Sequence, residues 1–210
     1  MKAKRPDLAE RFATIVRFLM LNPLMLPGST AKKPVGSEEY FSALARRYVQ
    51  AREPKSPKPP STVPDPLVSF ILHVYFNLDE ASLDRAQKEH QWSMAAENMV
   101  GDLLERYLAS VLEPEGWVWC AGSVVKSVDF IIPRDEKSGE WVALQIKNRD
   151  NSENSSSKAV RHGTAIAHWF RTFSRTGNTN WSAFPDAALR DRLSEDGFRT
   201  FASEYLNALK

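Results

Sequence analysis

The pentapeptides VDFII, residues 128–132, and ALQIK, residues 143–147, decide the fold of this 210-residue chain. Both are short apolar runs, which are typical of buried β-strands. The polar turn PRDEKSG, residues 133–139, joins them and predicts a hairpin. In the second run Gln145 and Lys147 stand two residues apart, so on a strand both side chains point to one face.

A carboxylate lies inside the first of these strands. Burial of Asp129 among apolar residues is costly unless the carboxylate is paired with a cation or binds a metal. If the strands pair, Asp129 faces Lys147, and the amide oxygen of Gln145 joins them in one small area. This set suits phosphodiester hydrolysis, in which the carboxylate binds Mg²⁺ and the lysine orients the attacking water. The alternative is a structural ion pair between Asp129 and Lys147 at the strand ends.

The segment before the strands predicts a long helix over residues 93–112. Glu97, Gly101 and Glu105 follow one another at intervals of four and therefore share one helix face. Glu97 is a candidate for a further metal ligand on that face. The alternative for Glu97 or Glu105 alone is a solvated helix surface.

The second half of the chain alternates between helix and strand signals. Strands are expected at 117–121, 124–132 and 141–147, and helices at 157–173, 186–192 and 197–209. The order helix, strands, helix predicts an α/β core in residues 91–210 that includes the C-terminal helices.

Residues 1–90 read as an all-helical N-terminal region. Its connector at 53–66 holds six of the 13 prolines, which favours an extended, semi-rigid segment. The next helix, 66–78, is strongly apolar, so we expect it to be buried on several sides. A separate short helix is expected at 79–91.

Charge is nearly balanced overall but unevenly distributed. The 28 Lys and Arg against 26 Asp and Glu give a net charge of +2. Residues 1–60 carry +7, residues 61–120 carry −7 and residues 146–175 carry +4. Such asymmetry can mark a polyanion-binding face, and the alternative is scattered solvated surface.

Composition also excludes several classes. With 42% hydrophobic and 26% charged residues, wholesale disorder is excluded, and the single cysteine excludes an internal disulfide or a cysteine-cluster metal site. Walker-type loops, dinucleotide glycine fingerprints and HExxH motifs are missing from the sequence. With neither a targeting signal nor an apolar stretch long enough to span a membrane, we expect a cytoplasmic protein without a membrane partner.

The spacing of the central residues resembles a known family. Asp129 is followed after fifteen residues by Gln145-Ile146-Lys147, and a glutamate-bearing helix precedes it, which resembles the PD-(D/E)xK nuclease superfamily. The longer string LQIKNRDNSENSSS at 144–157 is more specific. With its flanking residues, it is most similar to the SinI/AvaII group of type II restriction endonucleases over residues 93–181. The flanking residues are Glu97, Asn98, Gly101, Arg161, Gly163, Thr164, Trp169, Phe170 and Arg171.

This resemblance implies a restriction-endonuclease-like core of helix, mixed β-sheet and helix. It implies that Asp129 is the central Mg²⁺ ligand, that Lys147 positions and activates the attacking water, and that Glu97 is the helix carboxylate. Gln145 stands in the second acidic position as a neutral ligand or as an orienting residue, which removes one negative charge from the metal site. Val128 takes the place of the proline in the motif name.

The polar run after the motif supplies candidate contacts to DNA. Asparagine pairs bidentately with adenine and arginine with guanine, while serine and lysine bind phosphates. The candidates are Asn148, Arg149, Asn151, Asn154, Ser155, Ser156, Lys158 and Arg161. Arg171 and Arg175 are candidates for holding the DNA backbone. The alternative is a mobile polar loop without a ligand.

The sequence thus predicts a Mg²⁺-dependent type II restriction endonuclease that cleaves double-stranded DNA at a short (pseudo)palindromic site. The group resemblance indicates a site such as GGWCC, and the symmetry of such a site predicts a homodimer. Because Gln145 replaces an acidic residue, one alternative is a DNA-binding protein of the same fold that does not cleave DNA. A structure-selective repair nuclease is a further alternative.

Overall fold

The computed structural model describes residues 6–28, 34–61, 63–135, 140–150 and 166–210. The chain divides into two compact units, and each is described by itself. The first, here called the sheet unit, comprises Met1–Pro54 and Leu104–Lys210. The second, the α3 unit, comprises Lys55–Leu103.

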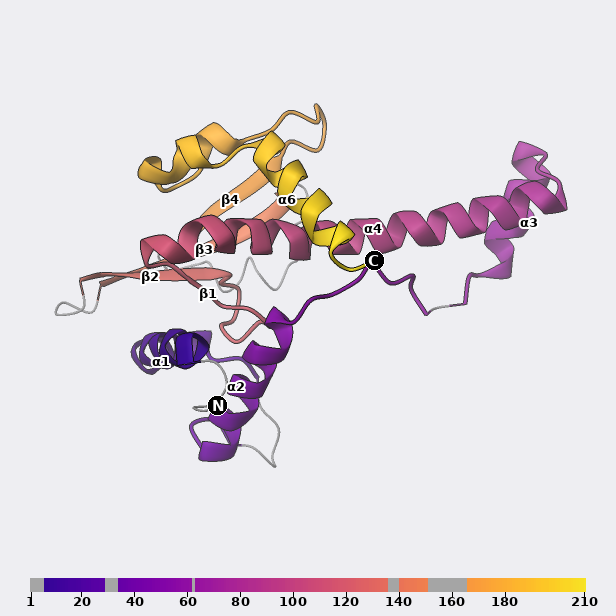
Figure 1. Cartoon of the computed structure of the whole chain (residues 1–210). Coiled ribbons are helices and arrows are strands. Elements are labelled where there is room, and N and C mark those ends of the chain that lie inside the picture. The colour runs from indigo at the N-terminus through magenta and orange to yellow at the C-terminus, as the bar shows by residue number, and fades with distance from the viewer. Residues whose placement is uncertain (1–5, 29–33, 62, 136–139, 151–165) are drawn as a thin grey trace. The chain divides into compact units, whose positions relative to one another are not determined.

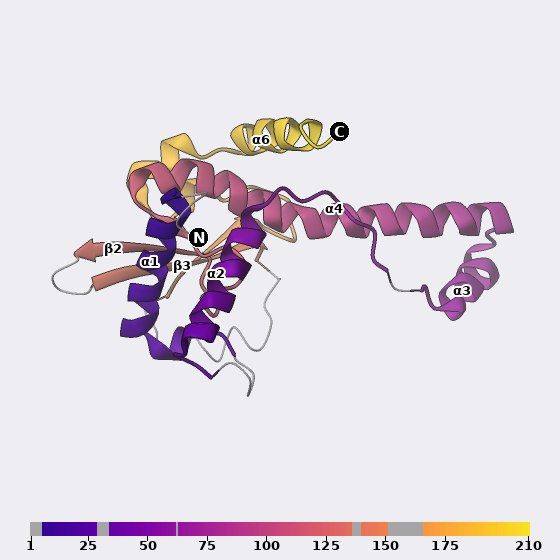
Figure 2. The same ribbon diagram turned by 60° about the horizontal axis from the view of Figure 1, so that its bottom comes forward.

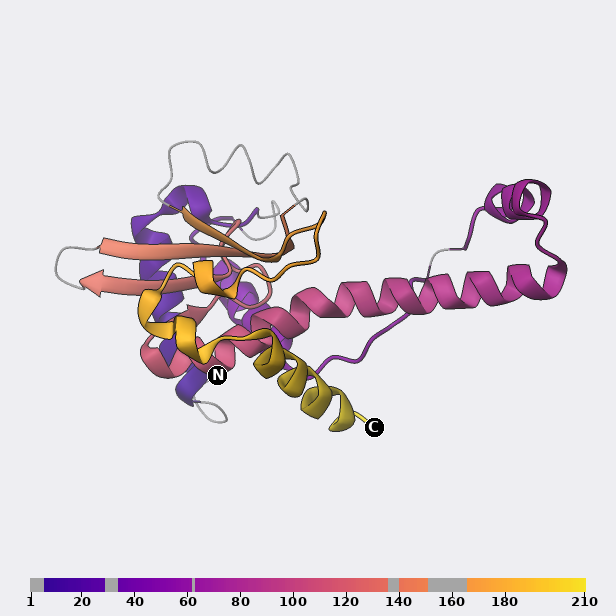
Figure 3. The ribbon, with the colours of Figure 1, turned by 90° about the horizontal axis from the view of Figure 1, so that it is seen from above.

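A four-stranded mixed β-sheet forms the centre of the sheet unit (Figure 1). Its strands lie in the order β1 (Val118–Trp119), β2 (Phe130–Asp135), β3 (Glu140–Arg149) and β4 (Ile166–Thr172). The first three pair antiparallel, and β4 pairs parallel with β3. Figure 3 shows β2 and β3 side by side, as expected for the hairpin that the sequence predicts.

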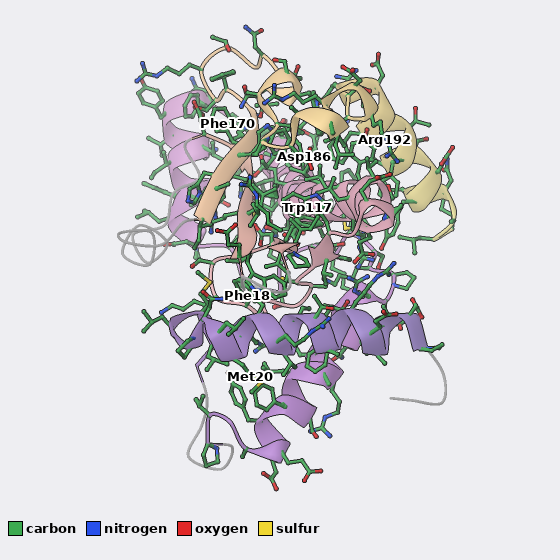
Figure 4. The ribbon with its side chains drawn as sticks, turned by 90° about the vertical axis from the view of Figure 1, so that its left-hand side faces the viewer. Phe18, Met20, Trp117, Phe170, Asp186 and Arg192 are labelled. Atoms are coloured by element: carbon green, nitrogen blue, oxygen red, sulfur yellow. The ribbon has the colours of Figure 1, made fainter. Side chains whose placement is uncertain are left out.

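Helices cover both faces of this sheet (Figure 1). On one face lie α1 (Pro6–Leu21) and α2 (Glu38–Arg52), which pack side by side in Figure 2. Phe18 of α1 meets Trp141 of β3 edge to face, with ring centroids 5.4 Å apart. Figure 4 shows Phe18 on the sheet side of α1 and Met20 on the opposite side, in agreement with exposures of 1% and 73%.

The other face is covered by the end of α4 (Glu80–Leu112), from Leu104 onward, and by α6 (Glu195–Asn207). Trp169 of β4 packs on Trp181, and Tyr107 of α4 meets Trp181 edge to face. Because side chains alternate along a strand, Trp169 and Trp141 lie on opposite faces, which accounts for the two helical layers. Short 3₁₀ helices occur at Pro23–Met25, Glu113–Glu115, Trp181–Ala183 and Ala187–Arg192.

A partly buried ion pair joins α2 to the start of the sheet. Arg52 donates to both carboxylate oxygens of Glu113 and also to the backbone oxygen of Trp119, 3.0 Å away. Glu113 accepts from the backbone N–H of Trp119 at 3.2 Å. Arg106 caps the end of α2 by donating to the backbone oxygens of residues 51, 52 and 53. These contacts fix β1 against α2 without involving the candidate site residues.

The predicted strand over 124–132 is wrong in its first half. The chain turns between Ala121 and Ser127, and β2 begins at Phe130. Ser123 and Ser127 have φ values of 52° and 59°, in the left-handed region and far from the extended backbone of a regular strand. Val124 and Val125 are nonetheless buried, so their apolar character reflects burial of a loop.

The predicted helix over 157–173 is also wrong where the structure describes it, because residues 166–172 form β4. A short apolar run cannot be assigned to helix or strand from periodicity alone. Pairing with β3 decides the outcome, and this pairing lies outside the local sequence. Residues 157–165 lie outside the described part of the chain.

The α3 unit corrects two further predictions. The helices expected at 79–91 and 93–112 form one continuous helix, α4, since neither glycine nor proline interrupts residues 80–100. The apolar helix appears as α3 (Pro66–Phe76), capped by Asp65, whose side chain accepts from the N–H of Leu67. The predicted burial of α3 is wrong: none of its 11 residues, all of them described, is buried.

A search of the described helices for membrane spans finds none that is long and apolar enough to cross a bilayer.

Candidate active site

Asp129 is held firmly at the point where the β2–β3 ladder ends. Its N–H donates to the backbone oxygen of Leu144 at 2.9 Å, and its own backbone oxygen accepts from Cys120 at 2.8 Å. Its carboxylate oxygen Oδ2 accepts from the N–H of Ile146 at 2.6 Å. If the β2–β3 ladder continued in register, the N–H of Ile146 would pair with the backbone of residue 128. The side chain of Asp129 accepts this hydrogen bond instead. The carboxylate is therefore fixed relative to β3.

The surroundings of this carboxylate disfavour its charge. Burial raises the pKa of Asp129 from an ordinary 3.8 to about 6, although the hydrogen bond from Ile146 and the charge of Lys147 both act to lower the pKa. Asp129 is thus ionised at neutral pH at a cost in free energy. Perturbed carboxylates of this kind are concentrated at functional sites.

Gln145 lies beside Asp129 on β3, with 5% of its surface exposed. Its oxygen Oε1 is buried and has no hydrogen-bond partner among the residues that the structure describes. A buried acceptor without a partner costs about 1–3 kcal/mol. Such an oxygen is suited to accept a ligand, and a cation would satisfy it.

Lys147 follows two residues later on the same face of β3. It is half-buried, and its charge acts on the pKa of Asp129, so the ammonium group lies near the carboxylate. The structure therefore brings together Asp129, Gln145 and Lys147 at one end of β3, as the alternation of the sequence predicts. Glu97, the remaining candidate, lies exposed on α4 in the α3 unit and is not among the residues that the sheet brings together.

The donor set fits Mg²⁺ better than a softer metal. A carboxylate and an amide oxygen are hard ligands, and Mg²⁺ commonly retains several waters beside one or two protein ligands. The described residues contain no cluster of three or more His, Cys, Asp or Glu side chains that could hold a metal. A metal at this place would therefore use the orphaned oxygen of Gln145 in addition to Asp129.

His168 lies next to Gln145 in the sheet. In the parallel β3–β4 ladder it is the register partner of Gln145, and its side chain is exposed. The sequence offers His168 either as a DNA contact or as a residue packed beside Trp169. Its position beside Gln145 was not predicted, because residues 166–172 were assigned to a helix.

Glu105 has a structural role in the sheet unit. Its Oε2 accepts from the indole N–H of Trp119 at 2.8 Å, which ties α4 to β1. The two glutamates of the predicted helix face therefore differ, since Glu97 is exposed while Glu105 is hydrogen-bonded.

Of the predicted DNA contacts, Asn148 and Arg149 lie at the end of β3, and the two candidates for holding the DNA backbone, Arg171 and Arg175, are also among the described residues. The Oδ1 of Asn148 accepts from Arg171 at 2.9 Å, and Arg171 also donates to Glu195 at 2.6 and 2.8 Å. Arg171 thus has its charge matched by Glu195 in the fold. Arg149 is exposed. The other predicted contacts, Asn151, Asn154, Ser155, Ser156, Lys158 and Arg161, lie outside the described residues.

Comparison with known proteins identifies the family of the chain. The model of the SinI restriction endonuclease family matches residues 1–208. The type II restriction enzyme Eco47I of Escherichia coli is 49% identical over 209 residues, which cover 98% of this chain and 90% of that enzyme. The type II restriction enzyme SinI of Salmonella infantis is 48% identical over 208 residues, again covering 98% and 90%.

A match of this extent places the chain in the class of restriction endonucleases. More narrowly, the chain belongs to the SinI restriction endonuclease family. This confirms the resemblance that the residues around Asp129 and Lys147 indicated. The match also extends over the N-terminal helices, where the sequence motifs gave no such indication.

Proposed function

We propose that this protein is a Mg²⁺-dependent type II restriction endonuclease that hydrolyses double-stranded DNA at a short (pseudo)palindromic site. The observation that carries the proposal is the placement of Asp129, Gln145 and Lys147 at one end of β3 in a chain of this family. The candidate recognition site is GGWCC, from the resemblance to the SinI/AvaII group. A homodimer matches the symmetry of such a site.

Asp129 and Gln145 would hold the metal. Glu97 is the helix carboxylate that the family resemblance implies. The ion would polarise the scissile phosphate and lower the pKa of a bound water. Asp129 contributes the negative charge, and its hydrogen bond from Ile146 fixes the direction of the carboxylate. Gln145 contributes a neutral oxygen that is already desolvated, so binding a cation there costs little further dehydration.

Lys147 acts on the nucleophile and on the phosphate. Its ammonium group orients a water for in-line attack and offsets the negative charge that develops on the phosphate oxygens. Attack forms a new bond from the water oxygen to phosphorus and breaks one phosphodiester P–O bond. The attacking water gives up one proton to solvent, and the departing oxygen takes up one proton from solvent and becomes a hydroxyl group.

The residues after Lys147 are proposed to contact DNA. Asn148, Arg149, Asn151, Asn154, Ser155, Ser156, Lys158 and Arg161 are the candidates. The net charge of +4 over residues 146–175 supports binding to the phosphate backbone. Asn148 keeps its amide NH₂ for such a contact, because its engagement with Arg171 uses Oδ1.

A second function is favoured by one observation. Gln145 replaces an acidic ligand, and a site with one carboxylate in the sheet binds a divalent cation more weakly than a site with two. A protein that binds the site without cleaving it is therefore the competing proposal. The fixed, perturbed carboxylate of Asp129 supports cleavage over this alternative.

Cleavage of a sequenced plasmid in the presence of Mg²⁺ separates the two. We expect discrete fragments from the wild type, and none from Asp129→Ala or Lys147→Ala. The matched controls are Asp191→Ala and Lys126→Ala, which remove exposed side chains of the same kinds from the sheet unit and should leave cleavage unchanged. Specific DNA binding by the wild type without any cleavage would refute the endonuclease.

A further inference from the structure

Helix α3 has an unusual surface for a soluble helix. Of its 11 residues, seven are large hydrophobic residues that are at least 50% exposed. They are Leu67, Val68, Phe70, Ile71, Val74, Tyr75 and Phe76. At 100° per residue they cover about two thirds of the helix circumference, with Ser69 and His73 on the remaining side, and the helix contains no Asp, Glu, Lys or Arg. An apolar surface of this width requires cover.

The helix is well formed at both ends, so its exposure is not a consequence of fraying. Asp65 caps its beginning, and Asn77 ends it in the left-handed conformation with a φ of 55°. A helix of 11 residues is also too short to span a bilayer, which requires about 20 residues. Figure 2 shows α3 beside the beginning of α4 in the α3 unit, and that contact leaves the seven side chains exposed.

The amount of exposed surface is in the range of a protein interface. With roughly 100 Å² exposed on each side chain, the seven present roughly 700 Å² of apolar surface. The largest apolar patch of a typical monomer is about 300–600 Å². A standard interface buries about 800 Å² on each partner. The surface of α3 is thus close to one half of a stable dimer interface.

The chemistry of this surface favours an identical partner. In a contact between two copies, like charges meet, so a charged helix would repel the same helix of its partner. Helix α3 contains no Asp, Glu, Lys or Arg, so this repulsion does not arise. The residues at the rim on α4 have mixed signs, including Glu80, Asp84, Arg85 and Lys88, so they allow pairing of opposite charges. An isologous contact also gives the two-fold symmetry that the proposed palindromic site requires.

We propose that α3 is the interface through which two copies of this chain associate, with α3 of one copy packed against α3 of the other. The inference rests on the proposed function, which requires a two-fold symmetric dimer, and it assigns the dimer contact to the surface of α3. It also accounts for the apolar sequence of α3, because dimerisation covers side chains that are exposed in the α3 unit.

The test is the mass of the full-length protein by sedimentation equilibrium, without DNA or Mg²⁺. The variant Phe70→Glu/Val74→Glu places two charges on one face of α3, four residues apart. The matched control is Met20→Glu/Leu24→Glu, which makes the same change at apolar residues that are 73% and 81% exposed in the sheet unit. Circular dichroism of each variant reports whether the helices are retained, and Phe70→Ser is a milder substitute if the double variant does not fold.

We expect a dimer for the wild type and the control at about 10 µM, and a dissociation constant at least 100-fold larger for the α3 variant. A wild type that is monomeric at this concentration would overturn the inference and would indicate that α3 is covered by its own chain or by another protein. A variant that remains dimeric would overturn it as well. Because the measurement uses neither DNA nor metal, loss of cleavage in any variant would bear on the proposed function and leave the dimer result intact.

Discussion

The carboxylate of Asp129 is expected to destabilise the fold that holds it, and Asp129→Asn tests this. Raising the pKa of Asp129 from 3.8 to about 6 corresponds to about 3 kcal/mol against the ionised form, as an upper value. Asparagine keeps the shape and an oxygen that can accept from the N–H of Ile146, 2.6 Å from the carboxylate in the wild type. The variant removes the buried charge and should therefore be more stable at neutral pH.

The sign of the pH dependence follows from the raised pKa. Well below pH 3.8 Asp129 is protonated in both the folded and the unfolded chain, so the free energies of unfolding of wild type and variant should be similar. As the pH rises from 3.8 to about 6, the unfolded chain loses this proton while the folded wild type keeps it, so the wild type loses stability. The stability advantage of Asp129→Asn should grow over this window to between about 1 and 3 kcal/mol and then stay constant.

Urea denaturation at several pH values between 4.5 and 8, in EDTA, measures this difference. Asp191→Asn is the control, because Asp191 is exposed and its replacement should change the free energy of unfolding by no more than about 0.5 kcal/mol at any pH. Adding Mg²⁺ should stabilise the wild type and leave Asp129→Asn unaffected. A variant that is less stable than the wild type at pH 7, or a difference that does not change with pH, would refute the reasoning.

Three further outcomes are expected. Gln145→Glu should supply a second carboxylate and lower the Mg²⁺ concentration for half-maximal cleavage by about tenfold in a metal titration. If that Mg²⁺ concentration is unchanged or higher, Gln145 is not a ligand. At limiting Mg²⁺ the wild-type cleavage rate should rise about tenfold per pH unit below pH 6 and level off above pH 7, because Asp129, with a pKa of about 6, must lose its proton to act. A rate that does not change with pH would contradict this role. Arg52→Ala leaves Glu113 with Arg11, 3.0 Å away, as its ion-pair partner and should lower the free energy of unfolding by about 1.5–3 kcal/mol in urea. Arg46→Ala at an exposed position should cost under about 0.5 kcal/mol.

The arrangement around Asp129 was predictable because it depends on local patterns. The alternation along residues 143–147 assigns Gln145 and Lys147 to one face, and the hairpin brings Asp129 to them, as the structure has it. Family membership followed from the same residues. The roles of these residues, and of Glu97, stay predictions.

The sequence by itself determined the β2–β3 hairpin and the cluster at its end, since a strand period of two and a short turn need no distant partner. Tertiary structure alone decided that residues 166–172 form a strand, because pairing with β3 supplies backbone hydrogen bonds that no local pattern encodes. It also decided that Arg171 pairs with Glu195. For α3, an apolar sequence predicts that a helix will be covered but does not say by what, and in the α3 unit its large side chains are exposed.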